Sequence, residues 1–441
     1  MKKLFRFILT WGFRLLLAAL VLGFAWSMLW GRWTTEPLTL PPRVELTYAD
    51  AAADGLITPE EIAVHYAPEI NAAVNVLISG AGKGDFITAV DFDGDFSALN
   101  NWENMASHPL NAVVYWSVQE TDTHWFAGYY LYHPRDDAEI WLDRHENDME
   151  GVMLAIPKGV DAFLPPQIMY TQGHGNVFFY TDGTPVMLEG SRHEGGIALD
   201  GDRPVIYVAP NGTLSNAGHS IESALDNSTY WAVGNNGVRY YHGGQAQQPA
   251  TFNGDYEGNR CSYALRPLTE LWALRHGPYG DEGVFAEYGA FRGENYGVNK
   301  ANPPWGWRNK TRFGFGGSFL SDPAWTINRA IDGANLSAMY TVNPYADWRI
   351  SGIRAVIPVT QDASGCTVHL LCDGWEFSDP AWFTLAEEKP GTWRVTLGDE
   401  ARSALYVAAP HTATWRMEIR QPDGRSVIGG VVVFTAEKLA P

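Results

Sequence analysis

The residues of this sequence that could do chemistry lie in one short stretch. His145, Asp148 and Glu150 have the spacing H-x-x-D-x-E, and Asp136 and Asp137 lie about one short loop upstream. The apolar residues that follow predict a β-strand, in which successive side chains point to opposite faces. Asp148 and Glu150 therefore stand at the end of a face that is otherwise apolar.

Two carboxylates on one strand face need a charge partner. About 4 Å apart, they repel each other by roughly 4 kcal/mol at an effective dielectric near 20. A proton, a basic side chain or a cation must relieve this repulsion. His145 lies three residues before Asp148, so an ideal strand points it to the opposite face. It joins the acids only if Glu146 and Asn147 form a bend, which Asn tolerates.

The donor types favour a particular class of metal ion. Oxygen ligands with a single imidazole suit a hard divalent ion such as Mg²⁺, Ca²⁺ or Mn²⁺ better than zinc. The alternative is that Asp148 and Glu150 begin the strand in solvent and that His145 caps the turn. On spacing alone the alternative is favoured, because H-x-x-D-x-E is common by chance.

Several longer segments resemble a known superfamily. The runs YYLYHPRDD and RHENDMEGVMLAI are similar to the signature of the necrosis- and ethylene-inducing toxins, and closer still to relatives of the vacuolar protein sorting-associated protein 62. The latter carry a His-Glu-x-Asp-x-Glu motif. Further segments that resemble this branch are HYAPEI at 65–70, YTQGHG at 170–175, RPVIYVAPNG at 203–212 and, more weakly, NPPWGW at 302–307.

The resemblance implies a β-sandwich that holds a divalent cation, Mg²⁺ or Ca²⁺ before Mn²⁺. Its ligands would be His145, Asp148, Glu150 and one upstream Asp. Asp136 follows a Pro-Arg step, as the family pattern asks, whereas Asp137 has the better spacing to His145, so both remain candidates.

The resemblance also implies a further His near the ion, in contact with it through water. His174 in GHG is the first candidate and His219 in AGHS is the second. Met149 stands where the better-known toxins carry Trp. This departure leaves the ligands unchanged and argues against the toxin-like activity.

Composition bounds the class of protein. The chain has 441 residues, enough for two domains, and a formal net charge of −19. Its Lys and Arg are not clustered beyond the first positions, which argues against nucleic acid as a partner. The counts of Gly (45) and Trp (18) indicate short strands and long loops, so the fold class is mainly β.

The first 31 residues predict a signal anchor. Lys2, Lys3, Arg6 and Arg14 precede an uncharged run at 15–31, which spans roughly 25 Å as a helix. The basic flank keeps this end cytoplasmic, so the main body is expected to be exported, periplasmic or extracellular. The rival reading is a signal peptide cleaved after Ala-Trp-Ser at 25–27, with the protein then secreted.

Four parts are expected along the chain. After the anchor at 1–31, a Pro-rich stalk spans 32–59, the metal-binding β-sandwich with its helical cover spans 60–340, and a smaller β-sandwich spans 341–441. The segment at 50–61 copies several EF-hand loop positions. However, Thr58-Pro59-Glu60-Glu61 reads better as a capping box that opens a helix running to about residue 73.

Alternating and apolar runs predict the strands. Those at 112–118 and 125–132 are expected to form a hairpin that leads into the motif, and others are expected at 177–180, 185–188 and 205–208. Residues 267–292 and 321–331 are expected as helical or irregular cover, with a helix beginning at Ser321-Asp322-Pro323. In the smaller sandwich, strands are expected at 348–359, 366–372, 392–398, 404–408, 414–420 and 428–436.

Cys366 and Cys372 are close in sequence, but a disulfide between them is not expected. The run between them predicts a strand whose ends lie about 20 Å apart, beyond disulfide reach.

Two functions are consistent with these features. The first is a membrane-anchored, exported protein whose cation binds glycan or lipid head-group oxygens. The second is a hydrolase in which the cation activates a water and His174 or His219 is the general base. The common hydrolase and nucleotide signatures are missing, so the sequence does not decide whether the protein is an enzyme, and no catalytic residue is assigned.

Overall fold

A computed structural model gives the fold. It describes residues 2–30, 38–76, 81–137, 144–173, 175–188, 190–212, 218–225, 236–251, 254–279, 283–293, 301–307, 317–338, 340–346, 348–358, 363–372, 375–378, 380, 382–397, 406–407, 415–427 and 432–438.

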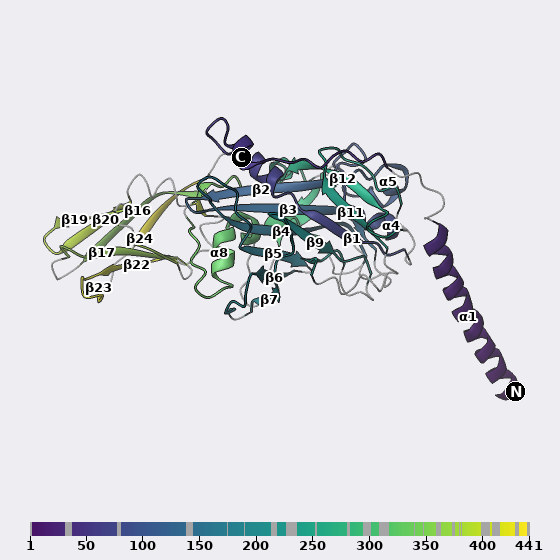
Figure 1. Ribbon diagram of the computed structural model, residues 1–441. Coiled ribbons are helices and arrows are strands. Elements are labelled where there is room, and N and C mark those ends of the chain that lie inside the picture. The colour runs from purple at the N-terminus through teal and green to yellow at the C-terminus, as the bar shows by residue number, and fades with distance from the viewer. Residues whose placement is uncertain are drawn as a thin grey trace.

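The main body is built on one mixed sheet (Figure 1). The sequence predicts a β-sandwich for this part, but its strands form a single sheet that curls into a half-barrel. The order of the strands across the sheet is β10 (Ile221–Ser223), β9 (Arg203–Val208), β1 (Glu69–Ala73), β11 (Gly237–His242), β12 (Arg260–Pro267), β2 (Val113–Thr121), β3 (His124–Asp136), β4 (His145–Pro157), β5 (Ile168–Gly173), β6 (Asn176–Thr181) and β7 (Arg192–Gly195). β8 (Leu199–Asp200) also pairs with β9, and β15 (Tyr340–Val342) also pairs with β2.

The predicted hairpin is confirmed and is longer than expected. β2 and β3 pair antiparallel, and β3 continues to Asp136, where it pairs with β4. The expected strand at 185–188 is reduced to one bridge between Met187 and Ile331.

Alternate side chains of the central strands enter two different hydrophobic cores. On β3, Tyr129 and Leu131 belong to a core shared with β1, β9 and β11, whereas Tyr130 and Tyr132 face a second core. Described residues between Leu268 and Tyr345 cover that second core, and they include members of both ranges expected as helical or irregular cover, 267–292 and 321–331. The cover contains α6 (Thr269–Trp272), β13 (Phe285–Glu287), β14 (Ala290–Phe291), η4 (Pro304–Gly306), α7 (Ser318–Ser321) and α8 (Pro323–Asn328).

The capping box is confirmed, although its helix is shorter than predicted. Thr58 caps α3 (Pro59–His65) and Glu61 returns the hydrogen bond, with Pro59 at the first helical position. The chain then turns into β1 rather than continuing as helix to residue 73, because Glu69–Ala73 pairs with both β9 and β11. Three more short helices precede β2, namely α2 (Tyr48–Ala51), α4 (Ala81–Gly84) and α5 (Asn101–Ser107).

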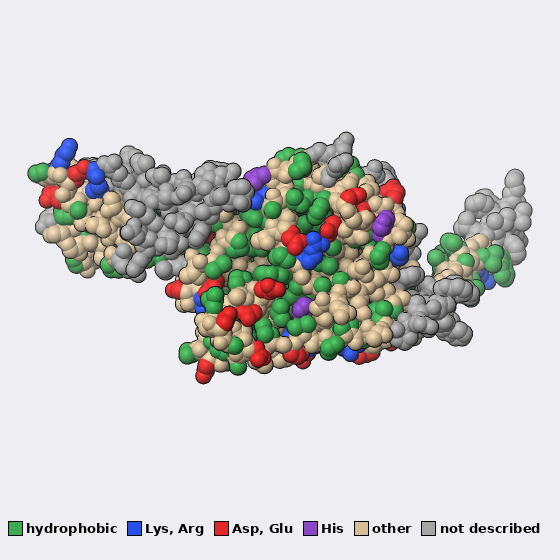
Figure 2. All heavy atoms as spheres, turned by 90° about the horizontal axis from the view of Figure 1, so that it is seen from above, with side chains coloured by type: hydrophobic (Ala, Val, Ile, Leu, Met, Phe, Trp, Pro, Cys, Tyr) green, Lys and Arg blue, Asp and Glu red, His purple; other side chains and the backbone are tan. Residues whose placement is uncertain are grey.

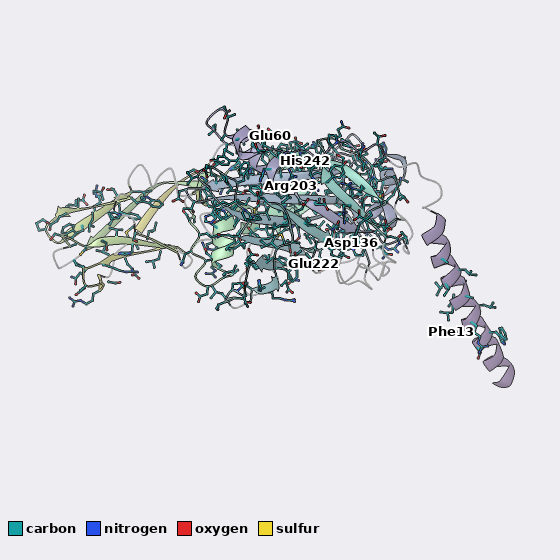
Figure 3. All side chains as sticks on the ribbon, in the orientation of Figure 1. Phe13, Glu60, Asp136, Arg203, Glu222 and His242 are labelled. Atoms are coloured by element: carbon teal, nitrogen blue, oxygen red, sulfur yellow. The ribbon has the colours of Figure 1, made fainter. Side chains whose placement is uncertain are left out.

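The segment 38–47, expected as part of a stalk, lies against the body. Val44 donates its backbone N–H to His242 at 2.9 Å, and Arg203, labelled in Figure 3, donates to the carbonyl of Val44 at 2.8 Å. The Tyr241 hydroxyl donates to the carbonyl of Pro41 at 2.7 Å. We call residues 38–47 the docked segment.

The described strands beyond residue 347 form two further antiparallel sheets, next to one another in Figure 1. Strand β17 begins directly after Cys366 and ends at Cys372, so it holds these two residues at opposite ends, as predicted. The boundary at 340/341 stays a prediction. The first sheet contains β19 (Phe383–Lys389), β20 (Thr392–Leu397), β16 (Trp348–Pro358), β21 (Tyr406–Val407) and β24 (Val432–Lys438), and the second contains β18 (Trp375–Phe377), β17 (Thr367–Cys372), β22 (Trp415–Arg420) and β23 (Ser426–Val427).

The N-terminal segment is helical, as α1 (Lys2–Trp30), and is drawn apart from the body in Figure 1. Within the described residues, no helix combines the length and the apolar character needed to cross a bilayer, so the predicted transmembrane anchor is not supported.

Charged groups are mixed on the face of the body shown in Figure 2. Acidic side chains form several separate groups there, and the coloured Lys and Arg lie in smaller groups among them. This mixture accords with the net charge of −19. The exclusion of nucleic acid as a partner stays a prediction.

Asp322, in the segment that covers the second core, is expected to make the stability of the fold depend on pH. It caps α8 through the Trp325 N–H and accepts the Tyr340 hydroxyl at 2.7 Å. Burial raises the pKa of Asp322 to about 6, although both hydrogen bonds lower it. The folded protein therefore binds this proton more tightly than the unfolded chain, and stability falls as the pH rises from about 4 to about 6.

We expect Asp322→Asn to remove this dependence, because Asn keeps the cap without a charge. Between pH 4 and pH 7 the variant should gain roughly 2 kcal/mol of unfolding free energy over the wild type. Urea denaturation of both proteins at the two pH values measures the gain. An equal difference at both values would contradict it.

Candidate metal centre

The bend that the motif requires is present at Asn147. Its φ is 58°, in the left-handed region, so the strict alternation of β4 is broken between His145 and Asp148. The Asn147 side chain secures the bend: its Oδ1 accepts from the Tyr132 hydroxyl at 2.5 Å and from Asn101 Nδ2 at 2.7 Å. The condition that the sequence sets for His145 to join the acids, a bend at Glu146-Asn147, is therefore met by the backbone.

His145 is paired with the upstream acid across the β3–β4 ladder. Asp136 lies directly opposite it, and His145 Nε2 is 3.4 Å from Asp136 Oδ2. Burial alone would lower the pKa of His145, but Asp136, and then the charge of Asp148, outweigh burial and raise this pKa to about 9. The imidazole therefore lies within electrostatic reach of both acids.

The two upstream candidates have different surroundings. Asp137 Oδ1 accepts from Arg135 Nη2 at 2.9 Å and lies 3.4 Å from Arg144 Nε, while its backbone N–H donates to Asn211 Oδ1 at 2.6 Å. Asp136, labelled in Figure 3 at the end of the body away from the C-terminal strands, faces His145 instead. Geometry therefore favours Asp136 over Asp137 as the acid that joins the motif.

Glu150 follows Asp148 on the same face of β4. Both residues are buried, Glu150 with 4% and Asp148 with 7% of the whole residue exposed. The Gln172 amide on β5 donates to Glu150 once its oxygen and nitrogen are assigned from the hydrogen-bond pattern. The cluster thus extends from β3 across β4 to β5.

His219, the second candidate for the further His, lies in the cluster. Its Nδ1 is 2.8 Å from Asp148 Oδ2 and its Nε2 is 3.2 Å from Asp85 Oδ1. Burial lowers the pKa of His219, but the two carboxylates outweigh burial and raise it to about 10. Both ring nitrogens therefore donate. The first candidate, His174, lies outside the described residues.

Two residues of this cluster are absent from the sequence prediction. Asp85 is fully buried before β2, and no local pattern marks it. His133 stacks on His219, with ring centroids 3.7 Å apart and planes 7° apart, and lies opposite Asp148 in the ladder. A signal for His133 did exist, because pairing the two strands in register puts it beside Asp148.

Negative charge exceeds positive charge in the described part of the cluster. It contains four buried carboxylates, those of Asp85, Asp136, Asp148 and Glu150, and two imidazoles held in carboxylate pairs, those of His145 and His219. Burial also lowers the pKa of the third imidazole, His133, well below its ordinary value, so that ring stays neutral. Four minus two leaves an excess of two negative charges when all four acids are ionised.

The donors point at one another rather than at a common centre. Among the described residues, no three His, Cys, Asp or Glu side chains are placed as direct ligands of one ion. The donor set nevertheless fits a hard cation in chemistry, because it supplies carboxylate oxygens and one imidazole. Binding would require Asp136 and Glu150 to rotate toward the ion.

Comparison with known proteins finds similarity only among solved structures. No model of a protein family matches the chain, and no curated protein matches it. A structure described as "Toxin fold for microbial attack and plant defense" matches 56% of this chain and 91% of its own, with 13% identity and a TM-score of 0.28. "NLPPya in complex with mannosamine" matches 57% and 91%, with 13% identity and a TM-score of 0.27.

A third match is Necrosis and Ethylene inducing Protein 2 from the causal agent of cocoa's Witches Broom disease, with 13% identity and a TM-score of 0.21 over 44% of this chain and 69% of that one. These neighbours are necrosis- and ethylene-inducing toxins. Their TM-scores are too low for the likeness to carry an argument about this chain. The closer relation to the vacuolar-sorting branch is not supported and stays a prediction.

The bend can be tested with two substitutions at Asn147. Asn147→Ala and Asn147→Gly both remove the side-chain partner of Tyr132 and Asn101, which should cost about 1–3 kcal/mol of unfolding free energy. Ala should cost roughly 0.5–1 kcal/mol more, because only Ala is strained at a positive φ. Urea denaturation measures both variants. Equal stability of the two would argue against strain at this position.

Proposed function

We propose that the cluster binds one divalent cation and that the protein is a cation-dependent binding protein. The contact between Asp136 and His145, next to the Asn147 bend that separates His145 from Asp148 on β4, is the observation that supports this most directly. With all four acids ionised, the excess of two negative charges equals the charge of a single divalent ion; burial, however, raises the pKa of Asp85. Asp136, Asp148 and Glu150 would hold the ion together with His145.

Mg²⁺ and Ca²⁺ are the ions that best suit these donors, with Mn²⁺ as a further option. Each accepts carboxylate oxygens and leaves positions for water or for a ligand. Asp136 would then hold the ion through its carboxylate in place of its present contact with His145.

The ligand class in this proposal is an oxygen-rich group, a sugar or a lipid head group. The side chains of Asp136 and Asp148 keep 8% and 10% of their surface exposed, so a ligand would reach the ion from their side of the cluster. Hydroxyl and phosphate oxygens can replace water on a hard cation. Export of the main body stays a prediction.

The hydrolase alternative receives less support from the cluster. A general base needs an available lone pair within reach of the reacting water. Both ring nitrogens of His219 face carboxylates, so this imidazole has none to offer. Of the two bases expected from the sequence, only His174 is left, and it lies outside the described residues.

Metal content is the first test. We expect the purified full-length protein, loaded with Mg²⁺ or Ca²⁺ and desalted, to keep about one ion per chain, and Asp148→Ala to keep far less. Asp182→Ala, which removes an exposed acid away from the cluster, is the matched control. Elemental analysis gives the ratio. A chelator should also lower the melting temperature of the wild type and of the control, but not that of Asp148→Ala.

Retention of the ion by Asp148→Ala at the wild-type level would overturn the site. So would a wild type that never holds a stoichiometric ion under these conditions.

Ligand binding is the second test. We expect the cation-loaded protein to bind either immobilised glycans or vesicles of anionic phospholipid, with binding abolished by chelator and by Asp148→Ala but not by Asp182→Ala. The cation is required because it would supply the contact with the ligand oxygens. Binding that survives chelation would contradict this function. So would the absence of detectable binding to both the glycans and the vesicles.

A further inference from the structure

The feature that carries a further inference is the buried chain of contacts behind Asp148. His219 connects Asp148 to Asp85, and Asp85 is itself fixed by the backbone. The N–H of Asn75 donates to Asp85 Oδ2 and the N–H of Asn211 donates to Asp85 Oδ1, each at 2.6 Å. This carboxylate therefore has a set position before any ion is present.

Asp85 also supports the upstream acid by a second route. Asn211, whose N–H binds Asp85, accepts the backbone N–H of Asp137 through its side-chain oxygen at 2.6 Å. Asp137 directly follows Asp136, the acid opposite His145. One buried carboxylate is thus linked to both sides of the cluster: to Asp148 through His219, and through Asn211 to the backbone of Asp137, the residue after Asp136.

The orientation of His219 is held by more than its two hydrogen bonds. His133 covers one face of the ring in a nearly parallel stack, and both rings are fully buried. His219 also has a φ of 56°, a conformation that a non-glycine residue keeps only where its surroundings impose it. These restraints direct Nδ1 toward one oxygen of Asp148.

We propose that Asp85 and His133 are positioning residues of the cation site, and this rests on the function proposed above. Asp85 and His133 hold His219 so that it occupies Oδ2 of Asp148, which leaves Oδ1 for the cation. Neither residue contacts the ion. Partners of ligating carboxylates typically change metal affinity 10- to 100-fold when they are removed.

The test compares cation affinity with the stability of the cation-free protein. Isothermal titration of the full-length protein with Mg²⁺ or Ca²⁺, whichever the wild type retains, gives the affinity, and thermal unfolding in chelator gives the stability. We expect Asp85→Asn to weaken binding about tenfold or more. His133→Ala should do the same, whereas His133→Phe, which keeps an aromatic ring against His219, should bind much as the wild type does.

A stability control is needed because all of these positions are buried. Leu268→Ala empties a fully buried position in the second core, outside the cluster, so it should lower the melting temperature and leave the affinity unchanged. Wild-type affinity in both Asp85→Asn and His133→Ala would overturn the positioning role. The positioning role is also overturned if Leu268→Ala weakens cation binding as much as Asp85→Asn and His133→Ala do.

If Asp85→Asn does not fold, the pair His133→Ala and His133→Phe decides: equal affinities overturn the role, and the expected difference supports it. Failure of the proposed function looks different, because the wild type itself would then bind no cation.

Discussion

The antiparallel pairing of β3 and β4 is the constraint on which the rest of the cluster depends. Its register sets Asp136 against His145 and His133 against Asp148, so four polar side chains meet at the end of the β3–β4 ladder, beyond apolar positions such as Leu131 and Val152. Without Asn147, the alternation of β4 would separate His145 from Asp148 by the thickness of the sheet. The cluster needs both the regular pairing of β3 with β4 and the bend at Asn147 that interrupts the alternation of β4.

Features set by local chemistry could be predicted from the sequence. The Thr58–Glu61 capping box and the Asp322 cap are each made within one helical turn, and both form as expected. The bend at Asn147 was also predictable, because it follows from the need of His145 to reach the acids and from the tolerance of Asn for a left-handed φ.

Features set by distant parts of the chain could not be predicted. Asp85 joins the cluster only because β1, the turn after β9 and the loop before β10 meet around it, and nothing in its neighbours indicates this. The helix predicted up to residue 73 ends early for a similar reason, since β1 inserts between β9 and β11. A single curled sheet and a two-sheet sandwich also have the same alternating strands, so periodicity cannot separate them.

The docked segment has a mechanical consequence for anything attached ahead of it. Thr39, Pro41 and Val44 are joined to the body by hydrogen bonds from Gln247, Tyr241 and Arg203, and Val44 also donates to His242. A pull on the N-terminal end would load these bonds together before it reached α3 or β1. Because residues 38–47 are bound to the body, they add no length to a flexible linker. The distance between the body and anything attached ahead of residue 38 would therefore be shorter than a free stalk would allow.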